Sequence, residues 1–527
     1  MNQWIPMGKA ADSGGTDEKS SPEHGRVYFV GAGPGDPGLI TLRGFELLKQ
    51  ADIVLYDFLV NPMVLAPVPE TAEQICLGRH GHGRIWTQDE INQRMIDYAR
   101  QGKTIIRLKV GDPGVFGRLA EEVESVHRAG ITWEVVPGIS AALAAPSYAG
   151  VFMTHRKHAS AVAMVTGHEQ EAVNDSKIDF PSLAKFPGTL IFYMGVTTAP
   201  TWTRSLIEAG RNPKTPVAIV RRCSMTDQQA IYCTLEEVAA ELSRHQLRPP
   251  AVVLVDYAAQ TGSLPCWFAQ KPLLGQTILI TRPRSQALRL SRMLTELGAG
   301  CLLQPAIRIA APPQWKDVDA TIESIEQYDW LVFSSVNGVH FFFERFCEIF
   351  GDLRRLGSIR LATIGPRTTA AVESYRLRVD RQPDVYSADA LASALEAKEG
   401  DRFLLARANR GREVLAETLR KAGATVDQVI VYESTDVTEV EPDIADAMTN
   451  QQIDWITVTS SAIARSLASL FGSALQDVRL ASISPITSAV LRELGYEPAV
   501  EAEVFTMEGI VTAIRQHATQ LQQSQAP

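Results

Sequence analysis

Short apolar runs that end in glycine or in a polar residue recur along the first half of the chain. Each run has the length of a strand, and several are separated by stretches with helical spacing, such as residues 87–100, where Thr87 and Glu90 predict a capping box. This alternation predicts a layered α/β domain whose ligands bind beyond the carboxyl ends of the strands. The predicted strands cover residues 27–30, 53–57, 104–112, 133–138, 160–167, 189–195, 216–220 and 251–256.

The first of these runs leads into a loop that contains Gly31, Gly33, Gly35 and Gly38. A strand, a glycine turn and a helical pattern in succession let bare backbone approach a ligand closely. The spacing G-x-G-x-G, with Pro34 inside it, does not match the G-x-G-x-x-G of dinucleotide-binding folds. The loop is therefore either a wall of a nucleotide-like ligand site or a tight structural turn.

The alternation weakens around residues 258–276, where glycine and proline are frequent. This composition is typical of a connection between domains, so we place the main boundary there. Residues 1–25 contain several charges and no apolar core region, which favours a disordered tail over a signal peptide. We expect a disordered tail over 1–25, a first domain over 26–260, a linker over 261–274, a second domain over 275–520 and a tail over 521–527.

The second half contains an internal repeat with an offset of 125 positions. Leu279–Arg282 aligns with Leu404–Arg407, and Asp329–Ser335 aligns with Asp454–Ser460. We expect two similar α/β lobes with a substrate cleft between them, because ligand sites favour such interfaces. The alternative is a duplicated scaffold whose cleft has no function.

Composition and charge restrict the class of function. The 527 residues carry a net charge of -9, which argues against a general binder of nucleic acid or of membrane surfaces. The six cysteines are scattered without a C-x-x-C or a Cys/His cluster, which favours a reducing compartment and no metal site. No apolar stretch reaches the roughly 18 residues of a membrane helix, so we expect a cytoplasmic protein.

Four residues of the first half stand at strand ends or helix starts, where side chains can reach a ligand. Asp57 is either functional or a solvated acid, and Asp112 is either a ligand contact or a turn former before proline. Ser140 contacts a ligand or only caps the helix that starts there. Met194 belongs to a binding site or to the core of its strand.

Taken in order, the motifs of the first half strongly resemble the tetrapyrrole methylases, and within them the uroporphyrinogen-III C-methyltransferases, over residues 26–260. The resemblance implies a two-subdomain α/β fold, S-adenosylmethionine as co-substrate, two methylations of uroporphyrinogen III to precorrin-2, and a homodimer formed through this domain. The motifs are Val30–Gly38, Tyr56-Asp57, Gly111–Arg118, Val136–Ala142, Thr154–Arg156, Val165–His168 and Phe192–Gly195.

The same resemblance implies roles for individual residues. Asp57 would be the proton acceptor, and Arg79 stands where the family has its proton-donating lysine. Because arginine stays protonated, it is better suited to pair with a substrate carboxylate. Val110 and Cys223 also depart from the family, which has glycine and glycine-threonine there. The residues implied to bind the cofactor are Pro34, Gly111, Asp112, Val115, Ser140, Ala141, Met194 and Cys223.

The substrate implied by this resemblance carries eight carboxylates, which calls for local cations in an acidic protein. Each candidate is otherwise an ordinary surface residue. The candidates are Arg43, Arg79, Arg84, Arg118, His155 and Arg156.

The second half shows no nucleophile with its base, but small hydroxyl residues follow its apolar strands. These residues are N-caps or donors to anionic groups at helix starts. The pattern is similar to the uroporphyrinogen-III synthases over residues 273–520, a family that closes hydroxymethylbilane into the macrocycle while inverting one ring. By this resemblance Tyr432 would assist the leaving group; the alternative is a core tyrosine. The motifs are Ile280–Arg284, Phe333–Asn337, Ile364-Gly365, Val429–Glu433 and Val458–Ser461.

The two resemblances support each other, because the product of the synthase is the substrate of the methylase. We therefore expect a bifunctional enzyme that makes uroporphyrinogen III and commits it toward sirohaem or cobalamin. The alternative is another corrin-ring methylase fused to a non-catalytic binding module.

Overall fold

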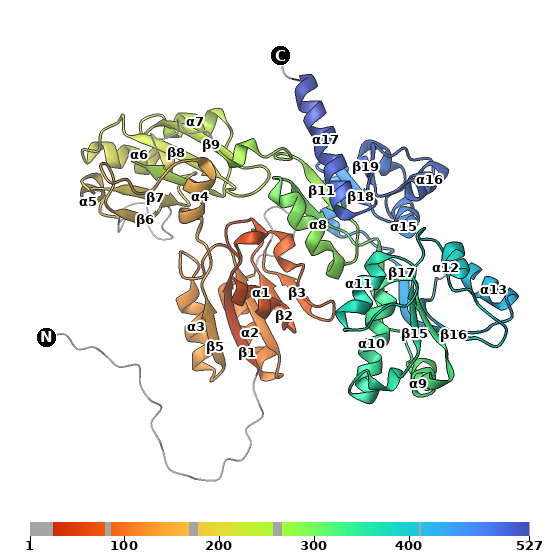
Figure 1. The fold of residues 1–527 in the computed structure, drawn as a ribbon. Coiled ribbons are helices and arrows are strands. Elements are labelled where there is room, and N and C mark those ends of the chain that lie inside the picture. Colours follow the sequence, from red (N-terminus) through yellow and green to blue (C-terminus); the bar gives the residue numbers. More distant parts are fainter. Residues whose placement is uncertain (1–24, 79–85, 168–177, 257–265, 411–412, 526–527) are drawn as a thin grey trace, which may run out of the picture.

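The computed structural model describes residues 25–78, 86–167, 178–256, 266–410 and 413–525. Within these residues the chain builds four five-stranded sheets, two from each half of the sequence. Helices cover both faces of each sheet and bury separate apolar clusters against them (Figure 1). The predicted α/β class, with two subdomains followed by two lobes, is confirmed.

The first subdomain is a fully parallel sheet with the strand order β3-β2-β4-β1-β5. The capping box at Thr87 forms as predicted and starts α2, because the Thr87 hydroxyl accepts from the Glu90 N–H while Glu90 accepts from the Thr87 N–H. Helices α2 and α3 pack on one face and α1 on the other. The elements are β1 (Arg26–Gly31), α1 (Leu42–Leu48), β2 (Ile53–Tyr56), β3 (Glu73–Cys76), α2 (Gln88–Arg100), β4 (Thr104–Lys109), α3 (Leu119–Arg128) and β5 (Thr132–Val136).

The second subdomain has a mixed sheet with the order β6-β7-β10-β8-β9, in which only β6 and β7 pair in parallel. Helix α4 enters it from the first subdomain and packs on one face, and α5, α6 and α7 cover the other. The elements are α4 (Ala141–Ala149), β6 (Val162–Thr166), α5 (Phe180–Ala184), β7 (Thr189–Tyr193), α6 (Ala199–Glu208), β8 (Pro216–Arg221), β9 (Gln229–Thr234), α7 (Val238–Arg244) and β10 (Ala251–Val255).

The second half forms two lobes, which we name lobe A and lobe B. Lobe A combines the start and the end of this half in a parallel sheet of order β12-β11-β18-β19-β20. Helices α8 and α17 cover one face, and α14, α15 and α16 the other. The elements are β11 (Thr277–Ile280), α8 (Arg284–Glu296), β12 (Gly300–Leu303), α14 (Pro442–Thr449), β18 (Trp455–Val458), α15 (Ser461–Phe471), β19 (Arg479–Ser482), α16 (Pro485–Glu493), β20 (Val500–Glu501) and α17 (Met507–Gln525).

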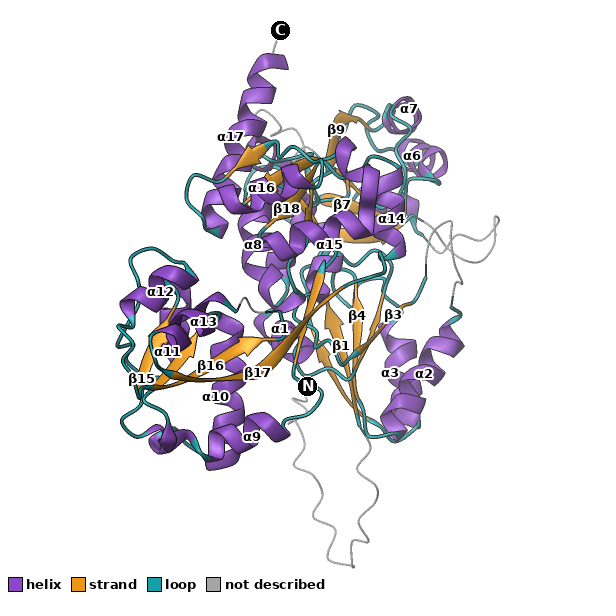
Figure 2. Cartoon of the chain, turned by 90° about the vertical axis from the view of Figure 1, so that its right-hand side faces the viewer, coloured by secondary structure: helices purple, strands orange, loops and turns teal. Residues whose placement is uncertain are grey.

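Lobe B consists of the middle of the second half, and its sheet has the order β13-β17-β16-β14-β15. The long strand β17 pairs antiparallel with β13, and this ribbon connects the two lobes (Figure 2). The elements are β13 (Ile307–Ala310), α9 (Lys316–Glu323), β14 (Trp330–Phe333), α10 (Val336–Phe350), β15 (Arg360–Thr363), α11 (Pro366–Ser374), α12 (Ala388–Ala394), β16 (Arg402–Ala408), α13 (Val414–Lys421) and β17 (Thr425–Asp436).

The sequence repeat has a structural counterpart, but one repeat does not make one lobe. Leu279 of β11 pairs with Ile456 of β18 in lobe A, and Leu404 of β16 pairs with Leu331 of β14 in lobe B. The 125-residue offset relates β11 to β16 and β14 to β18. Each lobe therefore takes one part from each repeat, so the two repeats are exchanged between the lobes.

The two halves of the chain pack against each other. Met63 and Ala66 of the first subdomain are buried in the same apolar cluster as Leu273 and β12 of lobe A. Part of the expected linker is also buried, because Phe268 packs on the Tyr148 ring at 4.9 Å. Residues 266–274 are therefore packed structure, while residues 261–265 lie outside the described residues. At the other end, α17 continues to Gln525, past the expected domain end at 520.

Candidate active sites

A cavity of about 350 Å³ lies where the carboxyl ends of β1, β2 and β4 face the second subdomain. The structure brings together here the described residues of the first half that were predicted to be catalytic or to bind the cofactor. Arg79 lies outside the described residues. The predicted residues that line the cavity are Pro34, Asp57, Gly111, Asp112, Val115, Ser140, Ala141, Met194 and Cys223.

Three glycines let the strand ends below this cavity meet backbone to backbone. A Cβ on Gly31 would lie 2.5 Å from the Gly138 Cα, and a Cβ on Gly138 would lie 2.2 Å from the Gly111 carbonyl oxygen. Gly33 donates to the Gly111 carbonyl and accepts from its N–H, which pins the glycine loop and places Pro34 at the cavity. The loop is thus a tight turn and a cavity wall at once.

Asp112 forms the turn that was one of its two interpretations, and also makes a longer-range contact. One carboxylate oxygen accepts from the Gly114 N–H at 2.8 Å, and the other accepts from the Gly138 N–H at 3.0 Å. These bonds fix the carboxylate at the cavity wall, with lone pairs left for a ligand.

Ser140 stands at the N-cap position of α4, but its hydroxyl makes no capping bond. Its Oγ lies 2.5 Å from the Tyr193 hydroxyl, which in turn accepts from the Ala142 N–H at 2.7 Å. The capping interpretation of Ser140 is therefore wrong, since a tyrosine from β7 takes that place. Burial raises the pKa of Tyr193 more than its two hydrogen bonds lower it, so the phenol stays neutral.

Met194 and Cys223 come from the second subdomain. Met194 is 48% exposed and has a φ of 52°, so it leaves its strand and points away from the core. The interpretation as a strand core residue is therefore wrong. Burial raises the pKa of the Cys223 thiol to about 12, which keeps it uncharged. Arg222 and Ser224 beside it also have positive φ, the kind of strained backbone that clusters at functional sites.

A cluster of four charges lies at the base of the cavity; Arg107, Lys109 and Glu122 are buried, and the Asp57 side chain is 33% exposed. Arg107 bonds to Asp57 at 2.6 Å and to Glu122 at 3.2 Å, and the Lys109 ammonium bonds to Glu122 at 2.8 Å. Asp57 also accepts from the Val110 N–H at 3.3 Å. Asp57 is thus oriented by an ion pair and is not the free solvated acid that was its alternative.

Lys109 is a cavity residue that the sequence reasoning missed. It is 3% exposed, lines the cavity and belongs to the same strand face as Arg107, two positions earlier. Burial, followed by the charge of Arg107, lowers its pKa, although Glu122 and Asp57 act in the opposite direction. Two cations on the buried face of an apolar strand are the signal that identifies this residue.

The expected carboxylate-binding cations do not line the cavity where the structure describes them. Arg43 is bound to Glu134 through two hydrogen bonds of 3.0 Å, and Arg118 is bound to Glu121. His155 and Arg156 also lie outside the cavity lining, and Arg84 is not among the described residues.

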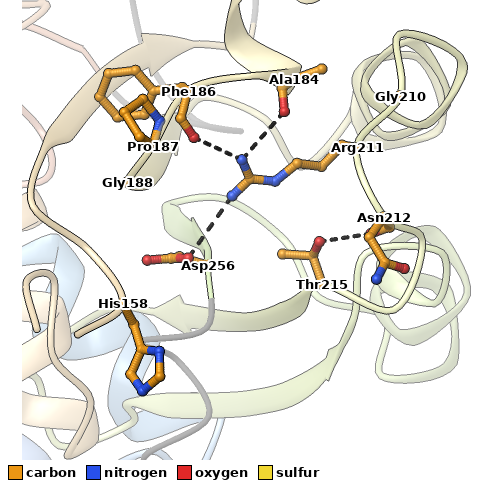
Figure 3. A pocket seen from close by; sticks show the side chains of 10 residues that line it. All are labelled: His158, Ala184, Phe186, Pro187, Gly188, Gly210, Arg211, Asn212, Thr215 and Asp256. Carbon is orange, nitrogen blue, oxygen red and sulfur yellow. Dashed lines mark hydrogen bonds and ion pairs between the residues drawn. The ribbon is translucent and has the colours of Figure 1, made fainter.

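A second hollow of about 270 Å³ lies beside β7 and β10 (Figure 3). Arg211 reaches across it to the carbonyl of Phe186 at 3.0 Å and to Asp256 at 3.9 Å. Asp256 also accepts from the Thr189 hydroxyl at 3.0 Å. The charged groups of this hollow are satisfied by each other, so its role is structural.

In the second half, Tyr432 of β17 is 7% exposed, belongs to an apolar cluster of lobe B and stacks on the Phe341 ring at 5.9 Å. Its hydroxyl donates to the Ser335 Oγ at 3.1 Å. Burial raises its pKa, while Ser335 and Asn337 lower it in part, so the phenol stays protonated and able to donate. Asn337 in turn accepts from Gln286 of α8 at 3.0 Å, which bonds lobe B to lobe A.

Beside this junction, a cavity of about 360 Å³ follows the carboxyl ends of β14 and β16. Ser334, Ile364 and Ser387 of lobe B line it together with Ile486 of lobe A. Several helices start around it; Ser335, Ser387 and Ser484 cap α10, α12 and α16 with their side chains. Among the described residues, no group of histidine, cysteine and acidic side chains could hold a metal ion, and no helix could span a bilayer.

In the first half, loops with polar and charged side chains follow the strand ends and line a cavity between two subdomains. In the second half, such loops line a cleft between two lobes. This arrangement defines an enzyme chain of two α/β modules. The family model of the Tetrapyrrole (Corrin/Porphyrin) Methylases matches residues 26–239, and that of Uroporphyrinogen-III synthase HemD matches residues 289–512. The chain therefore belongs to the tetrapyrrole methylase family in its first half and to the uroporphyrinogen-III synthase family in its second, which confirms both resemblances.

Individual relatives match the whole chain or a part of it. The porphyrin biosynthesis protein HemD of Ruminiclostridium josui is 32% identical over 93% of this chain and 95% of its own length. The uroporphyrinogen-III C-methyltransferase of Bacillus subtilis is 36% identical over 63% of this chain and 68% of its own. A crystal structure of uroporphyrin-III C-methyltransferase from Thermus thermophilus with S-adenyl homocysteine is 38% identical over 45% of this chain and 94% of its own, with a TM-score of 0.39.

Proposed function

We propose that this chain cyclises hydroxymethylbilane to uroporphyrinogen III in its second half and methylates the product twice to precorrin-2 in its first half. The observation that carries the methylase part is the single cavity that gathers Asp57 and the eight expected cofactor contacts. The synthase part is supported by the protonated phenol of Tyr432 in lobe B. Residues 26–260 and 275–520 would be the two functional units.

The residues of the first cavity fit S-adenosylmethionine. The cavity has a volume typical of small-molecule sites, and its walls combine apolar side chains with a few polar groups. Val115, Met194 and Val252 would contact the apolar parts of the ligand, and the Asp112 carboxylate would accept from its hydroxyl or ammonium groups. When bound, S-adenosylmethionine supplies the methyl group that an electron-rich pyrrole carbon attacks.

The chain's own contribution to this step is alignment and proton removal. Arg107 and the Val110 N–H hold Asp57 at the cavity wall. A carboxylate has about four lone-pair positions, so Asp57 retains free positions for a substrate proton. The neutral thiol of Cys223 and the neutral phenol of Tyr193, both from the second subdomain, add no charge to the cavity.

In the second half, Tyr432 would donate a proton to the hydroxyl group that leaves hydroxymethylbilane. Its hydrogen bond to Ser335 fixes the phenol, and burial keeps it protonated at neutral pH. The capped helix starts around the neighbouring cavity add backbone N–H groups and positive dipole ends for the substrate carboxylates.

Supplying the purified chain with hydroxymethylbilane, with and without S-adenosylmethionine, tests both halves. The oxidised products are separated by isomer and by mass. We expect the type III isomer without the cofactor and a dimethylated product with it. If only the symmetrical isomer forms, the synthase proposal fails and the second half is better explained as a binding module. If supplied uroporphyrinogen III gains no methyl groups, the methylase proposal fails and the first half is better explained as another methylase.

Asp57→Ala tests the proton acceptor. We expect a large loss of methyl transfer with nearly unchanged S-adenosylmethionine affinity by calorimetry. Asp97→Ala, an exposed acid on α2, is the matched control. Loss of affinity in Asp57→Ala would reassign Asp57 to cofactor binding. Arg79→Lys should retain activity if Arg79 pairs with a carboxylate.

A further inference from the structure

Two loops, one from each methylase subdomain, meet at the wall of the first cavity. The Asp36 N–H donates to the Ser224 Oγ at 2.9 Å. Gly35 lies so close to Met225 that a Cβ on Gly35 would be 2.6 Å from the Met225 sulfur. Pro34 and Met225 line the cavity from the two sides of this contact, which we call the seam. The shape of the cavity wall therefore depends on how the two loops are held against each other.

Asn61 connects the seam to lobe A on the side of the first subdomain. Its side-chain nitrogen donates to the Gly35 carbonyl at 2.7 Å and lies 3.8 Å from the Met225 sulfur. Its side-chain oxygen accepts from the Met63 N–H at 3.0 Å. Because the Met63 side chain is buried in the apolar cluster of α8, β12 and α17, Asn61 joins both loops to a segment that lobe A holds.

Thr226 makes the corresponding connection on the side of the second subdomain. Its hydroxyl accepts from the Gly275 N–H at 2.9 Å and donates to the Gln276 carbonyl at 3.4 Å, at the start of lobe A. A Cβ on Gly300 of β12 would lie 2.6 Å from the Thr226 Cγ2, so the two halves of the chain are in direct contact here. Thr226 follows Met225, and the backbone that carries this cavity residue is thereby fixed to lobe A.

Lobe A thus holds both sides of the seam, although none of its described residues lines the cavity. We propose that Asn61 and Thr226 are positioning residues of the methylase site, through which lobe A fixes the cavity wall for the methyl donor. Docking of lobe A and binding of S-adenosylmethionine are then coupled, and each strengthens the other by the same factor. The proposal rests on the methylase function proposed above and makes that site dependent on the synthase half.

Gly300→Ala tests the coupling from within the synthase half, since it changes no atom of the methylase half. The added methyl group overlaps with the Thr226 Cγ2, so lobe A can no longer dock in the same position. We expect the dissociation constant of S-adenosylmethionine, measured by calorimetry on the full chain, to rise about fivefold or more. Thr226→Ser removes the Cγ2 and keeps the hydroxyl, so the double variant should regain most of the affinity.

Asn61→Asp tests the other side of the seam. Aspartate still accepts from the Met63 N–H but cannot donate to the Gly35 carbonyl, so we expect a similar loss of affinity. Asn450→Asp, at an exposed asparagine that follows α14 in lobe A, is the matched control and should leave the affinity unchanged. Equal affinities in these two variants would remove Asn61 from the proposal.

The wild type provides a measurement that needs no variant. The Gly275 N–H donates to the hydroxyl and the carbonyl of Thr226, so S-adenosylmethionine should slow amide exchange in a peptide that contains Gly275 by about fivefold or more. A peptide from α13 in lobe B, which lies away from the methylase half, should exchange at the same rate with and without the ligand (Figure 1).

Three outcomes would overturn the coupling and leave the methylase function standing. The first is unchanged affinity in Gly300→Ala, the second is affinity that stays low in the double variant, and the third is unchanged exchange at Gly275 when the ligand is bound. Faster exchange throughout β11 and β18 in Gly300→Ala would show damage to lobe A and would also count against the proposal. If the wild type binds no S-adenosylmethionine, the methylase proposal itself fails and the coupling with it.

Discussion

Replacing Glu122 with glutamine removes one buried charge from the cluster at the base of the first cavity. Glu122 is 0% exposed and accepts from both Arg107 and Lys109, while Asp57 is the second anion of the cluster. The wild-type cluster has two cations and two anions, so the variant leaves one buried positive charge uncompensated. Glutamine has nearly the same volume, so no cavity contributes to the effect.

The size of the effect follows from the geometry. At 2.8 Å, the Lys109–Glu122 pair attracts by about 6 kcal/mol at an effective dielectric constant of about 20. Removing one partner of a buried pair costs about 3–5 kcal/mol in measured cases. We therefore expect the free energy for opening the first subdomain to fall by that amount. Exposed Glu121→Gln, which breaks a surface pair with Arg118, should cause no measurable change.

Amide hydrogen exchange of β1 and β4 measures this opening free energy, and each tenfold increase in rate corresponds to about 1.4 kcal/mol. The double variant Glu122→Gln with Lys109→Met restores charge balance, so it should be less destabilised than the sum of the two single variants. A cost below about 1 kcal/mol for Glu122→Gln, or simple additivity in the double variant, would refute the reasoning.

Three more predictions concern the two sites. Asp112→Asn should weaken S-adenosylmethionine binding about tenfold in calorimetry. The amide keeps only one acceptor oxygen for the two backbone N–H groups that hold the carboxylate in the wild type. Unchanged affinity would contradict a role of Asp112 in cofactor binding. Gly138→Ala should lower stability by about 1–3 kcal/mol in thermal unfolding, since its Cβ would lie 2.2 Å from the Gly111 oxygen. Tyr432→Phe should slow cyclisation at least tenfold, and a fall of less than twofold would make Tyr432 a core residue.

The strands of the first half were predictable because their apolar runs are interrupted by glycine at the strand ends. The gathering of Asp57, Asp112 and Ser140 in one cavity follows from that order, since the strand ends of a sheet share one edge. Met194 reaches the same cavity from the sheet of the second subdomain. The choice between alternatives for each residue was not predictable. Whether Ser140 caps α4 depends on Tyr193, which reaches it from a strand 53 positions away.

The exchange of repeats between lobes A and B was not predictable from the offset alone. The aligned segments have the same strand and helix pattern whichever copy they pair with. The ribbon of β13 and β17 decides which segments share a lobe, because it carries the chain from lobe A to lobe B and back. A connection between lobes leaves no periodic signal in the sequence, so the presence of two lobes was predictable and the residues that compose each lobe were not.

The contact between the halves gives the methylase cavity a wall that depends on the synthase half. Arg222, Cys223 and Met225 line the cavity, and the strained backbone of Ser224 is held by the Gln228 side chain at 2.8 Å. Thr226, two residues after Ser224, accepts from the Gly275 N–H of lobe A at 2.9 Å. A backbone in a sparsely populated conformation persists only where its surroundings fix it. The docking of lobe A is thus one of the contacts that shape the site where the methyl donor is proposed to bind.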